Sequence, residues 1–448
     1  MGDSESSSWV SGLVQHIRAR RIVSKALQNI AWLSVDRVLR LTVGVFVGVW
    51  LARYLGPATF GQYSIAFALV ALFGVFSKLG LDGLLVREFV RQPQAHGELL
   101  GTALMMRLIG GALGAGAATL CSMLLRPDDV TVQLLAAIAS LGLVIQSFDV
   151  LDMWFQSRVS SRHVVVARST AFLLLAAVKI ALILLAASVT AFAIAAVAEM
   201  ILASIGLIIV YRVSGGRVSQ WRFSIARACA LLRPAAPLIF AGMAVSAYMK
   251  IDQVMIAAIL GDEAVGHYSA ATRITEATYF VPSMIMASLL PAIISIKDAS
   301  DVQFRDRMQR LFDLMVAIAL LLAVPLSLLS NVVVPLLYGS AYQESAPVLA
   351  VHVWANVFVF LGIASSGYLL ATNLTTVSLY RTALGAIANV VLNMAFIPAF
   401  GIVGAAWATL ASAFIATFAV LLNARSRSAG LMMLRALVPL HRFARKMN

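Results

Sequence analysis

The feature that most constrains this chain is a series of long apolar stretches along almost its whole length. A helix that crosses the hydrocarbon core of a bilayer needs about 20 mostly apolar residues, and twelve stretches of the sequence meet that length. With 61% hydrophobic and 12% charged residues, the chain cannot be a soluble globular protein, whose charged share is about a quarter. We therefore predict an all-α polytopic membrane protein. The predicted spans lie at about 30–51, 60–79, 99–124, 133–153, 166–187, 190–211, 236–259, 266–294, 311–337, 346–371, 378–397 and 401–423.

A short motif that occurs twice divides the chain into two similar halves. LGPATFGQYS at Leu55–Ser64 shares five of its ten positions with LGDEAVGHYS at Leu260–Ser269. Each copy joins one apolar stretch to the next, so each is expected to form the tight turn of a helical hairpin, with glycine supplying backbone freedom. Because each half has six spans, both halves enter the membrane from the same side. The prediction is two parallel six-helix lobes around a central cavity.

The basic residues of the connections fall almost entirely on one predicted face. That face receives both termini, whereas the opposite face has only Arg53 and Arg126. The positive-inside rule therefore predicts that both termini are cytoplasmic. The formal net charge of +14 is explained by this topology and needs no nucleic-acid partner. The expected location is the bacterial cytoplasmic (inner) membrane.

These assignments predict five segments along the chain. Residues 1–29 are a basic cytoplasmic segment, 30–211 the N-lobe and 236–423 the C-lobe. Residues 212–235 are a cytoplasmic linker between the lobes, and 424–448 form a basic amphipathic tail on the cytoplasmic surface.

Seven basic residues lie inside the predicted spans. Each costs about 2.5–3.5 kcal/mol on membrane-insertion scales when it has no partner, so these side chains must be paired or face water. Residues at equal distance from a hairpin turn lie at equal depth on neighbouring helices, which suggests four structural ion pairs. The seven basic residues are Arg37, Arg40, Lys78, Arg107, Lys179, Lys250 and Arg273. The four suggested pairs are Asp36–Lys78, Asp152–Arg168, Lys179–Glu199 and Asp252–Arg273.

Two local alternatives remain open within this set. Asp36 could pair with Arg40 at i, i+4, and Glu276 could pair with Arg273 at i, i+3. With either alternative, basic residues without an acidic partner remain in the predicted spans. Glu276 is the acidic residue that most clearly has no basic partner at matching depth. No acid lies at matching depth for Arg37, Arg40, Arg107 and Lys250.

An excess of positive charge inside a bundle suits a water-filled cavity that receives an anion, above all a phosphate held by guanidinium groups. The alternative for Arg37 is that its side chain reaches the interface or bonds to backbone carbonyls. The candidate substrate-binding residues are Arg37, Arg40, Arg107, Lys250 and Arg273. The candidate ion-coupling carboxylates are Glu276, Glu199, Asp36 and Asp252.

Other chemistry has little support in the sequence. There is no phosphate-binding loop with a following lysine, no Cys or His cluster at metal-ligand spacing and no credible Ser, His and Asp set. We therefore expect no cofactor, no metal and no enzymatic activity. The pairs His352 and Asn356, and Asn389 and Asn393, each lie on one helix face; they could bind sugar hydroxyls, but interhelical hydrogen bonds are the commoner role.

Three segments resemble the Wzx-type polysaccharide flippases of the superfamily that includes multidrug and toxin extruders. They are VDRVLRLTVGVFVGVWLARYLGPATFGQYSIA at Val35–Ala66, LGLDGLLVRE at Leu79–Glu88 and KIDQVMIAAILGDEAVGHYSAATRITEA at Lys250–Ala277. The resemblance implies a flippase that moves an oligosaccharide linked to undecaprenyl pyrophosphate from the cytoplasmic to the periplasmic leaflet by alternating access. It also implies a role in O-antigen or exopolysaccharide synthesis, with membrane lipids, a polymerase and export machinery as partners.

Two other functions stay open at this point. A cation-coupled drug antiporter of the same superfamily should have an acid-dominated cavity, and the basic excess argues against it. A membrane glycosyltransferase or polymerase would need a sizeable outer loop, whereas the predicted outward connections here have about ten residues or fewer.

Overall fold

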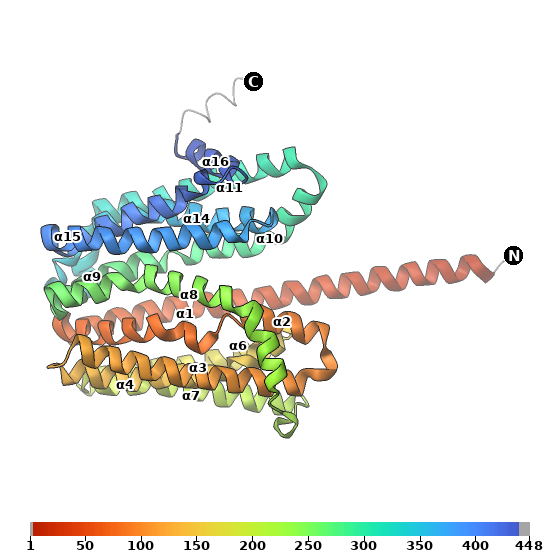
Figure 1. The fold of residues 1–448 in the computed structure, drawn as a ribbon, viewed down its shortest axis with the longest axis horizontal. Helices are drawn as coiled ribbons and strands as arrows, with labels where there is room; N and C mark the ends of the chain where they lie inside the picture. Colours follow the sequence, from red (N-terminus) through yellow and green to blue (C-terminus); the bar gives the residue numbers. More distant parts are fainter. Residues whose placement is uncertain (1–2, 439–448) are drawn as a thin grey trace.

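The computed structural model describes residues 3–438, and these residues form helices without any strand (Figure 1). This confirms the predicted all-α fold. The first bundle contains α1 (Asp3–Lys78), α2 (Asp82–Arg91), α3 (His96–Leu125), α4 (Val130–Ile145), α5 (Val150–Ser157), α6 (Ser161–Leu184) and α7 (Val189–Val213). The second bundle contains α8 (Ile225–Leu260), α9 (Asp262–Ala277), α10 (Phe280–Ala299), α11 (Asp301–Leu328), α12 (Ser330–Tyr338), α13 (Ser345–His352), α14 (Ala355–Ala371), α15 (Thr375–Phe418) and α16 (Arg427–Leu437). Five short 3-10 turns complete the described chain: Pro93–Ala95, Gln146–Asp149, Val218–Gln220, Ser340–Tyr342 and Ala419–Leu422.

Within the described residues, eight helices are long and apolar enough to cross a membrane, or nine when α13 and α14 count as one bent span. Two of the eight helices, α1 and α15, are each broken by a glycine with non-helical backbone angles, Gly56 and Gly401. Each of these two helices therefore supplies two spans. The arrangement is compatible with the twelve predicted spans.

The two copies of the repeated motif form the same turn. Gly56 has φ 71° and ψ 169°, and Gly261 has φ 90° and ψ −177°. Residues with side chains rarely adopt positive φ at such ψ, so glycine is required at both positions. The predicted hairpin turns are therefore confirmed. Both turns lie at the same end of the molecule, which we call the turn face; α2 and the beginning of α11 lie at the opposite end, the terminal face (Figure 1).

The two bundles meet along a seam at the turn face. One cluster of buried apolar side chains spans this seam, with Ala52 and Phe60 from α1 and Tyr268 from α9. The hydroxyl of Tyr342 in the second bundle donates to the carbonyl of Ala52 at 2.6 Å. The ribbons of the two bundles diverge toward the terminal face (Figure 1). These contacts hold the bundles together at the turn face, and the beginning of α8 also contacts the first bundle.

The connection between the bundles packs onto the first bundle. The backbone N–H of Arg222 donates to the carbonyl of Gly97 at 3.3 Å, and the N–H of Ser224 donates to Thr102 Oγ1 at 3.1 Å. At the other end of the chain, α16 packs on α11, where Gln309 Nε2 donates to the carbonyl of Met432 at 3.1 Å. The last part of the predicted amphipathic tail, 439–448, lies outside the described residues.

Candidate substrate and coupling site

Two of the four predicted ion pairs are present. Lys179 Nζ lies 2.8 Å from Glu199 Oε2, between α6 and α7. Arg168 Nη1 lies 2.9 Å from Asp152 Oδ2, and its Nη2 lies 2.6 Å from a second acid, Asp149. These pairs join neighbouring helices of the first bundle, so the depth argument is confirmed for them.

The predicted pair of Asp36 with Lys78 is wrong. Asp36 instead accepts from Arg40 Nε at 2.9 Å, the i, i+4 alternative, and from the hydroxyl of Ser169. The guanidinium of Arg40 also lies over the ring of Phe172, 5.1 Å from its centroid. Equal depth does not determine which way a side chain points around its helix, and Asp36 points toward α6.

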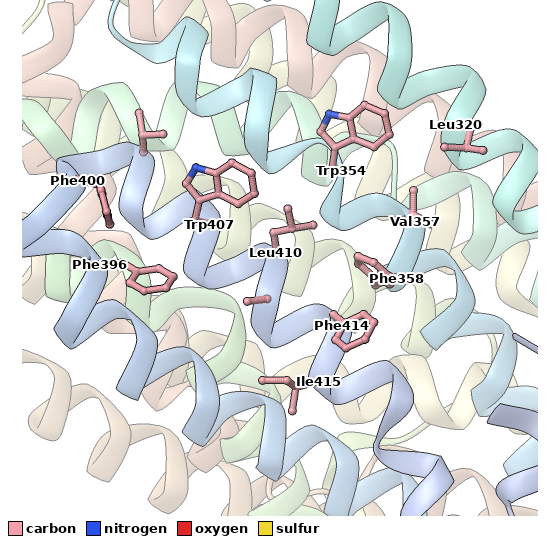
Figure 2. A pocket seen from close by; sticks show the side chains of 12 residues that line it. Leu320, Trp354, Val357, Phe358, Phe396, Phe400, Trp407, Leu410, Phe414 and Ile415 are labelled. Atoms are coloured by element: carbon pink, nitrogen blue, oxygen red, sulfur yellow. The ribbon is translucent and has the colours of Figure 1, made fainter. Parts of the chain in front are cut away.

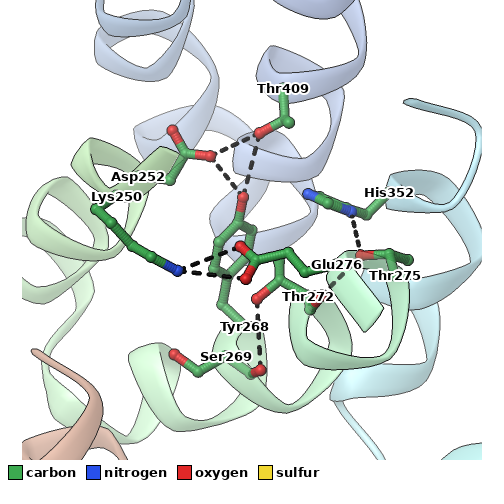
Figure 3. A network of polar contacts seen from close by, with 9 residues as sticks. All are labelled: Lys250, Asp252, Tyr268, Ser269, Thr272, Thr275, Glu276, His352 and Thr409. Atoms are coloured by element: carbon green, nitrogen blue, oxygen red, sulfur yellow. Dashed lines mark hydrogen bonds and ion pairs between the residues drawn. The ribbon is translucent and has the colours of Figure 1, made fainter. Parts of the chain in front are cut away.

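The predicted pair of Asp252 with Arg273 is also wrong, for the same reason. Asp252 is buried and accepts hydrogen bonds from Tyr268 at 2.7 Å and Thr409 at 2.6 Å (Figure 3). It also accepts one from Asn393 at 2.7 Å. All three partners are neutral. Arg273 points in another direction, toward α1. Asp252 therefore lies in a polar network of the second bundle and makes no ion pair within the described residues.

Besides Arg40, two more basic residues for which no acid lay at matching depth have an acidic partner. Lys250 Nζ lies 3.3 Å from both carboxylate oxygens of Glu276, so Glu276 is not a spare carboxylate (Figure 3). Arg107, whose side chain is 1% exposed, pairs with Asp82. Asp82 lies at the start of α2, outside the predicted spans, and for that reason the comparison of depths overlooked it.

Of the five candidate substrate-binding residues, Arg37 and Arg273 have no acidic partner within the described residues. Arg37 is exposed on α1. Arg273 Nη1 donates to the carbonyl of Gly48 in α1 at 3.4 Å, and its guanidinium lies 5.6 Å from the centroid of the Phe60 ring. Arg273 therefore lies where α9 faces α1, at the interface of the two bundles.

The structure does not gather the five candidate basic side chains into one cluster. Arg107 lines a polar cavity of about 340 Å³ inside the first bundle, whereas Lys250 lies on α8 beside α9. Arg40 contacts α6. A single substrate group that touched all of them would need the bundles to rearrange.

The paired polar residues of the second bundle act as interhelical hydrogen-bonding groups. His352 Nδ1 lies 2.8 Å from Thr275 Oγ1, and Asn356 donates to Thr278 at 2.9 Å. Asn393 donates to Asp252 at 2.7 Å, and Asn389 donates to Ser412 at 3.4 Å. The structure supports this role rather than sugar binding, because each pair is used between helices.

A large apolar cavity lies between α11, α14 and α15 (Figure 2). Its volume is about 1200 Å³, and it is lined by aromatic and aliphatic side chains such as Trp354, Phe396 and Trp407. No charged side chain lines it. This cavity therefore cannot hold an anionic group and is separate from the candidate site.

Interactions at the turn face were not predicted from the sequence. Arg126 Nη2 in the first bundle lies 2.5 Å from Asp262 Oδ1 in the second and donates to the carbonyl of Ala257 at 2.8 Å. Asp129 lies beside Asp262. Arg126 lies in a predicted connection, where a charge needs no partner, so no sequence signal indicates this contact.

A model of the polysaccharide biosynthesis protein family matches residues 26–297, more than half of the chain. The chain belongs to this family. The chain is also similar to a protein of Haloferax volcanii named "Probable flippase AglR", with 27% identity over 172 residues. That alignment covers 37% of this chain and 35% of the relative, so the chain spans about a third of that relative's length. The predicted family is confirmed.

The fold of this chain resembles those of two solved structures. This chain is similar to the inward closed conformation of the Lipid II flippase MurJ, with a TM-score of 0.71, 14% identity and coverage of 92% of this chain and 91% of that one. It is also similar to an inward-facing multidrug resistance MATE family transporter of the MOP superfamily, with a TM-score of 0.71, 16% identity and coverage of 89% and 98%. These likenesses establish the fold.

Proposed function

We propose that this chain is a flippase that carries an oligosaccharide linked to undecaprenyl pyrophosphate from the cytoplasmic to the periplasmic leaflet for surface polysaccharide synthesis. Membership of the polysaccharide biosynthesis family supports the substrate class. The similarity to a protein named probable flippase supports the transport step. In this proposal the terminal face is cytoplasmic, as the distribution of loop arginines predicts.

The observation that best supports the transport mechanism is the contact between the two repeats, in which each repeat packs against the turn of the other. The repeats contact each other at the turn face through Gly61 and Gly266, while the bundles diverge at the terminal face (Figure 1). Alternating access in repeat-built transporters is a rocking of one bundle against the other. The described state is then closed toward the periplasm and receives substrate from the cytoplasm.

Arg37 and Arg273 are the best candidates to hold the pyrophosphate. Neither has an acidic partner among the described residues, so an incoming anion would not have to displace a carboxylate. Guanidinium groups bind phosphate oxygens with two parallel hydrogen bonds. Arg40, Arg107 and Lys250 would contribute only after leaving Asp36, Asp82 and Glu276, respectively.

Asp252 is the best candidate for coupling to a cation gradient. The other three candidate carboxylates, Asp36, Glu199 and Glu276, each have a basic partner. Asp252 has only neutral partners and is 5% exposed. A buried carboxylate without a basic partner is costly to keep ionised, so a proton or a small cation would stabilise it.

The proposal is tested by measuring translocation of a fluorescent undecaprenyl-pyrophosphate oligosaccharide in proteoliposomes. Arg37→Gln and Arg273→Gln should each lower the initial rate about tenfold or more, since each hydrogen-bonded charge contributes about 1.5–3 kcal/mol. Arg310→Gln is the matched control, because Arg310 is 72% exposed near the start of α11. Wild-type protein that leaves the labelled lipid on one leaflet would refute the proposed function.

A further inference from the structure

A polar cavity inside the first bundle is not explained by the transport mechanism. It measures about 340 Å³ and lies between the end of α1, α2, α3, α5 and α6, near the terminal face where α2 lies (Figure 1). This volume is at the small end of the range of about 300–1,000 Å³ for ligand pockets in proteins. The cavity is therefore large enough for one small ligand.

The charges around this cavity balance. Three basic and three acidic side chains line it, and two of the basic ones are already neutralised. Arg168 pairs with both Asp149 and Asp152, and Arg107 pairs with Asp82. Lys78 makes no ion pair within the described residues, but the three positive and three negative charges of the lining sum to zero. The cavity therefore favours a ligand without net charge.

Several polar groups on the cavity wall have no partner in the part of the chain that the structure describes. The side chains of Gln146 and Gln156 make no hydrogen bond within the described residues, and Lys78 makes no ion pair there. Arg107 Nε is buried and is without a hydrogen-bond partner among the same residues. Buried polar groups are normally satisfied, so Arg107 Nε needs water or a ligand that accepts a hydrogen bond. Gln146 is half-buried and Lys78 and Gln156 are exposed, so these three side chains are free to bond to water or to a ligand at the cavity.

We propose that this cavity binds one neutral sugar ring of the transported glycan. A sugar ring carries hydroxyl groups that donate to carboxylates and accept from amide, ammonium and guanidinium groups, which matches the wall. Met153 and Val86 provide an apolar side for the C–H face of the ring. The inference rests on the proposed function, because it places a part of the substrate near the face from which that substrate would enter.

Gly83 offers a way to fill the cavity without disturbing the protein. It lines the cavity, and a Cβ added at this glycine would meet no other atom within 4 Å. A leucine side chain at this exposed position has room beside the cavity and is expected to narrow it. Gly116→Leu is the matched control, because Gly116 lies in α3 of the same bundle, does not line the cavity and has the same open surroundings.

The experiment is saturation-transfer NMR on the full chain in lipid nanodiscs, with D-glucose, D-galactose and N-acetyl-D-glucosamine as probes. At least one of these sugars should receive saturation on its ring protons. Gly83→Leu should lower that signal about tenfold, whereas Gly116→Leu should leave it unchanged. Gln146→Ala and Gln156→Ala should each raise the Kd about three- to tenfold, as expected for one lost hydrogen bond. The glutamine variants decide the matter if Gly83→Leu does not fold.

Three results would overturn the inference: no saturation of any probe, a signal that Gly83→Leu leaves unchanged, or displacement of the sugar by inorganic phosphate. Sugar binding is measured without translocation, so its outcome is separate from that of the flippase assay. Flipping without sugar binding would remove the inference and keep the proposed function. Sugar binding without flipping would remove the proposed function and keep the sugar site, but not its assignment to a transported glycan.

Discussion

Gly61 and Gly266 occupy equivalent positions in the two repeats, and each contacts the turn of the other repeat. A Cβ built on Gly61 would lie 1.8 Å from the carbonyl oxygen of Asp262, and one built on Gly266 would lie 2.0 Å from the carbonyl oxygen of Pro57. Asp262 and Pro57 are themselves equivalent positions. The contact is therefore reciprocal, like the two halves of an interface with twofold symmetry.

Gly61→Ala and Gly266→Ala should each open this seam. Glycine to alanine inside a helix normally stabilises it by about 1 kcal/mol, but here the new methyl group would overlap a backbone oxygen that cannot rotate away. Overpacking of this kind costs about 1–3 kcal/mol. The closed state should lose population, and translocation should slow.

Spin labels at Ala58 and Glu263 would measure this opening, because both residues are exposed beside the seam. The distance distribution should move to longer values in either glycine variant. Gly116→Ala serves as the control, since a Cβ there meets nothing within 4 Å. An unchanged distribution in both glycine variants would mean that the seam is not a barrier.

The population of the state in which this seam is closed should also depend on pH through Asp262, which precedes the predicted span at 266–294. Burial raises the pKa of this carboxyl above its usual value; Arg126 partly offsets the increase, and the neighbouring Asp129 adds to it. A carboxyl with a raised pKa in the closed state favours closure at low pH. The closed population should therefore fall as the pH rises from about 4 through the raised pKa.

The Ala58 to Glu263 distance, recorded as a function of pH, checks this prediction. Asp262→Asn should abolish the dependence, because the amide does not titrate. Arg126→Gln should leave the carboxylate without its basic partner, raise the pKa of Asp262 further and move the transition to higher pH. A transition that persists in Asp262→Asn would assign the effect to another group.

Lys179 and Glu199 should behave as a structural pair. Removing one partner of a buried ion pair costs about 3–5 kcal/mol, whereas replacing both by apolar residues is often neutral. Lys179→Met should therefore lower the midpoint of thermal unfolding, and the double variant Lys179→Met with Glu199→Met should recover most of it. If the double variant folds well but no longer responds to a cation gradient, Glu199 has the coupling role instead.

Asp252→Asn should separate transport from coupling. The amide can still accept hydrogen bonds from Tyr268 and Thr409, so the network should be largely kept. Translocation driven by a proton or sodium gradient should fall to the rate seen without a gradient. The measurement is the ratio of the two rates in proteoliposomes, and a wild-type ratio in Asp252→Asn would exclude this carboxylate.

Local sequence signals predicted the backbone of this protein well. The glycines at positions 56 and 261 identified the two turns, and the short connection between α6 and α7 identified the pair of Lys179 with Glu199. Both inferences use neighbours in the chain. Helix length and turn position are set by such local features.

Contacts between distant helices could not be predicted in the same way. Asp252 and Arg273 lie at similar depth, yet Asp252 points toward α15 and Arg273 toward α1. The rotation of each helix about its axis decides this, and it is set by packing against helices far away in the sequence. Charged residues outside the spans, such as Asp82, were left out of the comparison although they reach inward.

The docked connection between the two bundles has a mechanical consequence. The backbone N–H groups of Arg222 and Ser224 donate hydrogen bonds to Gly97 and Thr102 of the first bundle. This connection therefore cannot act as a flexible linker between the bundles. Any change of angle between the bundles has to be absorbed further along α8, past its two prolines at positions 234 and 237. Lengthening the connection would then leave the range of motion unchanged, whereas stiffening α8 would restrict it.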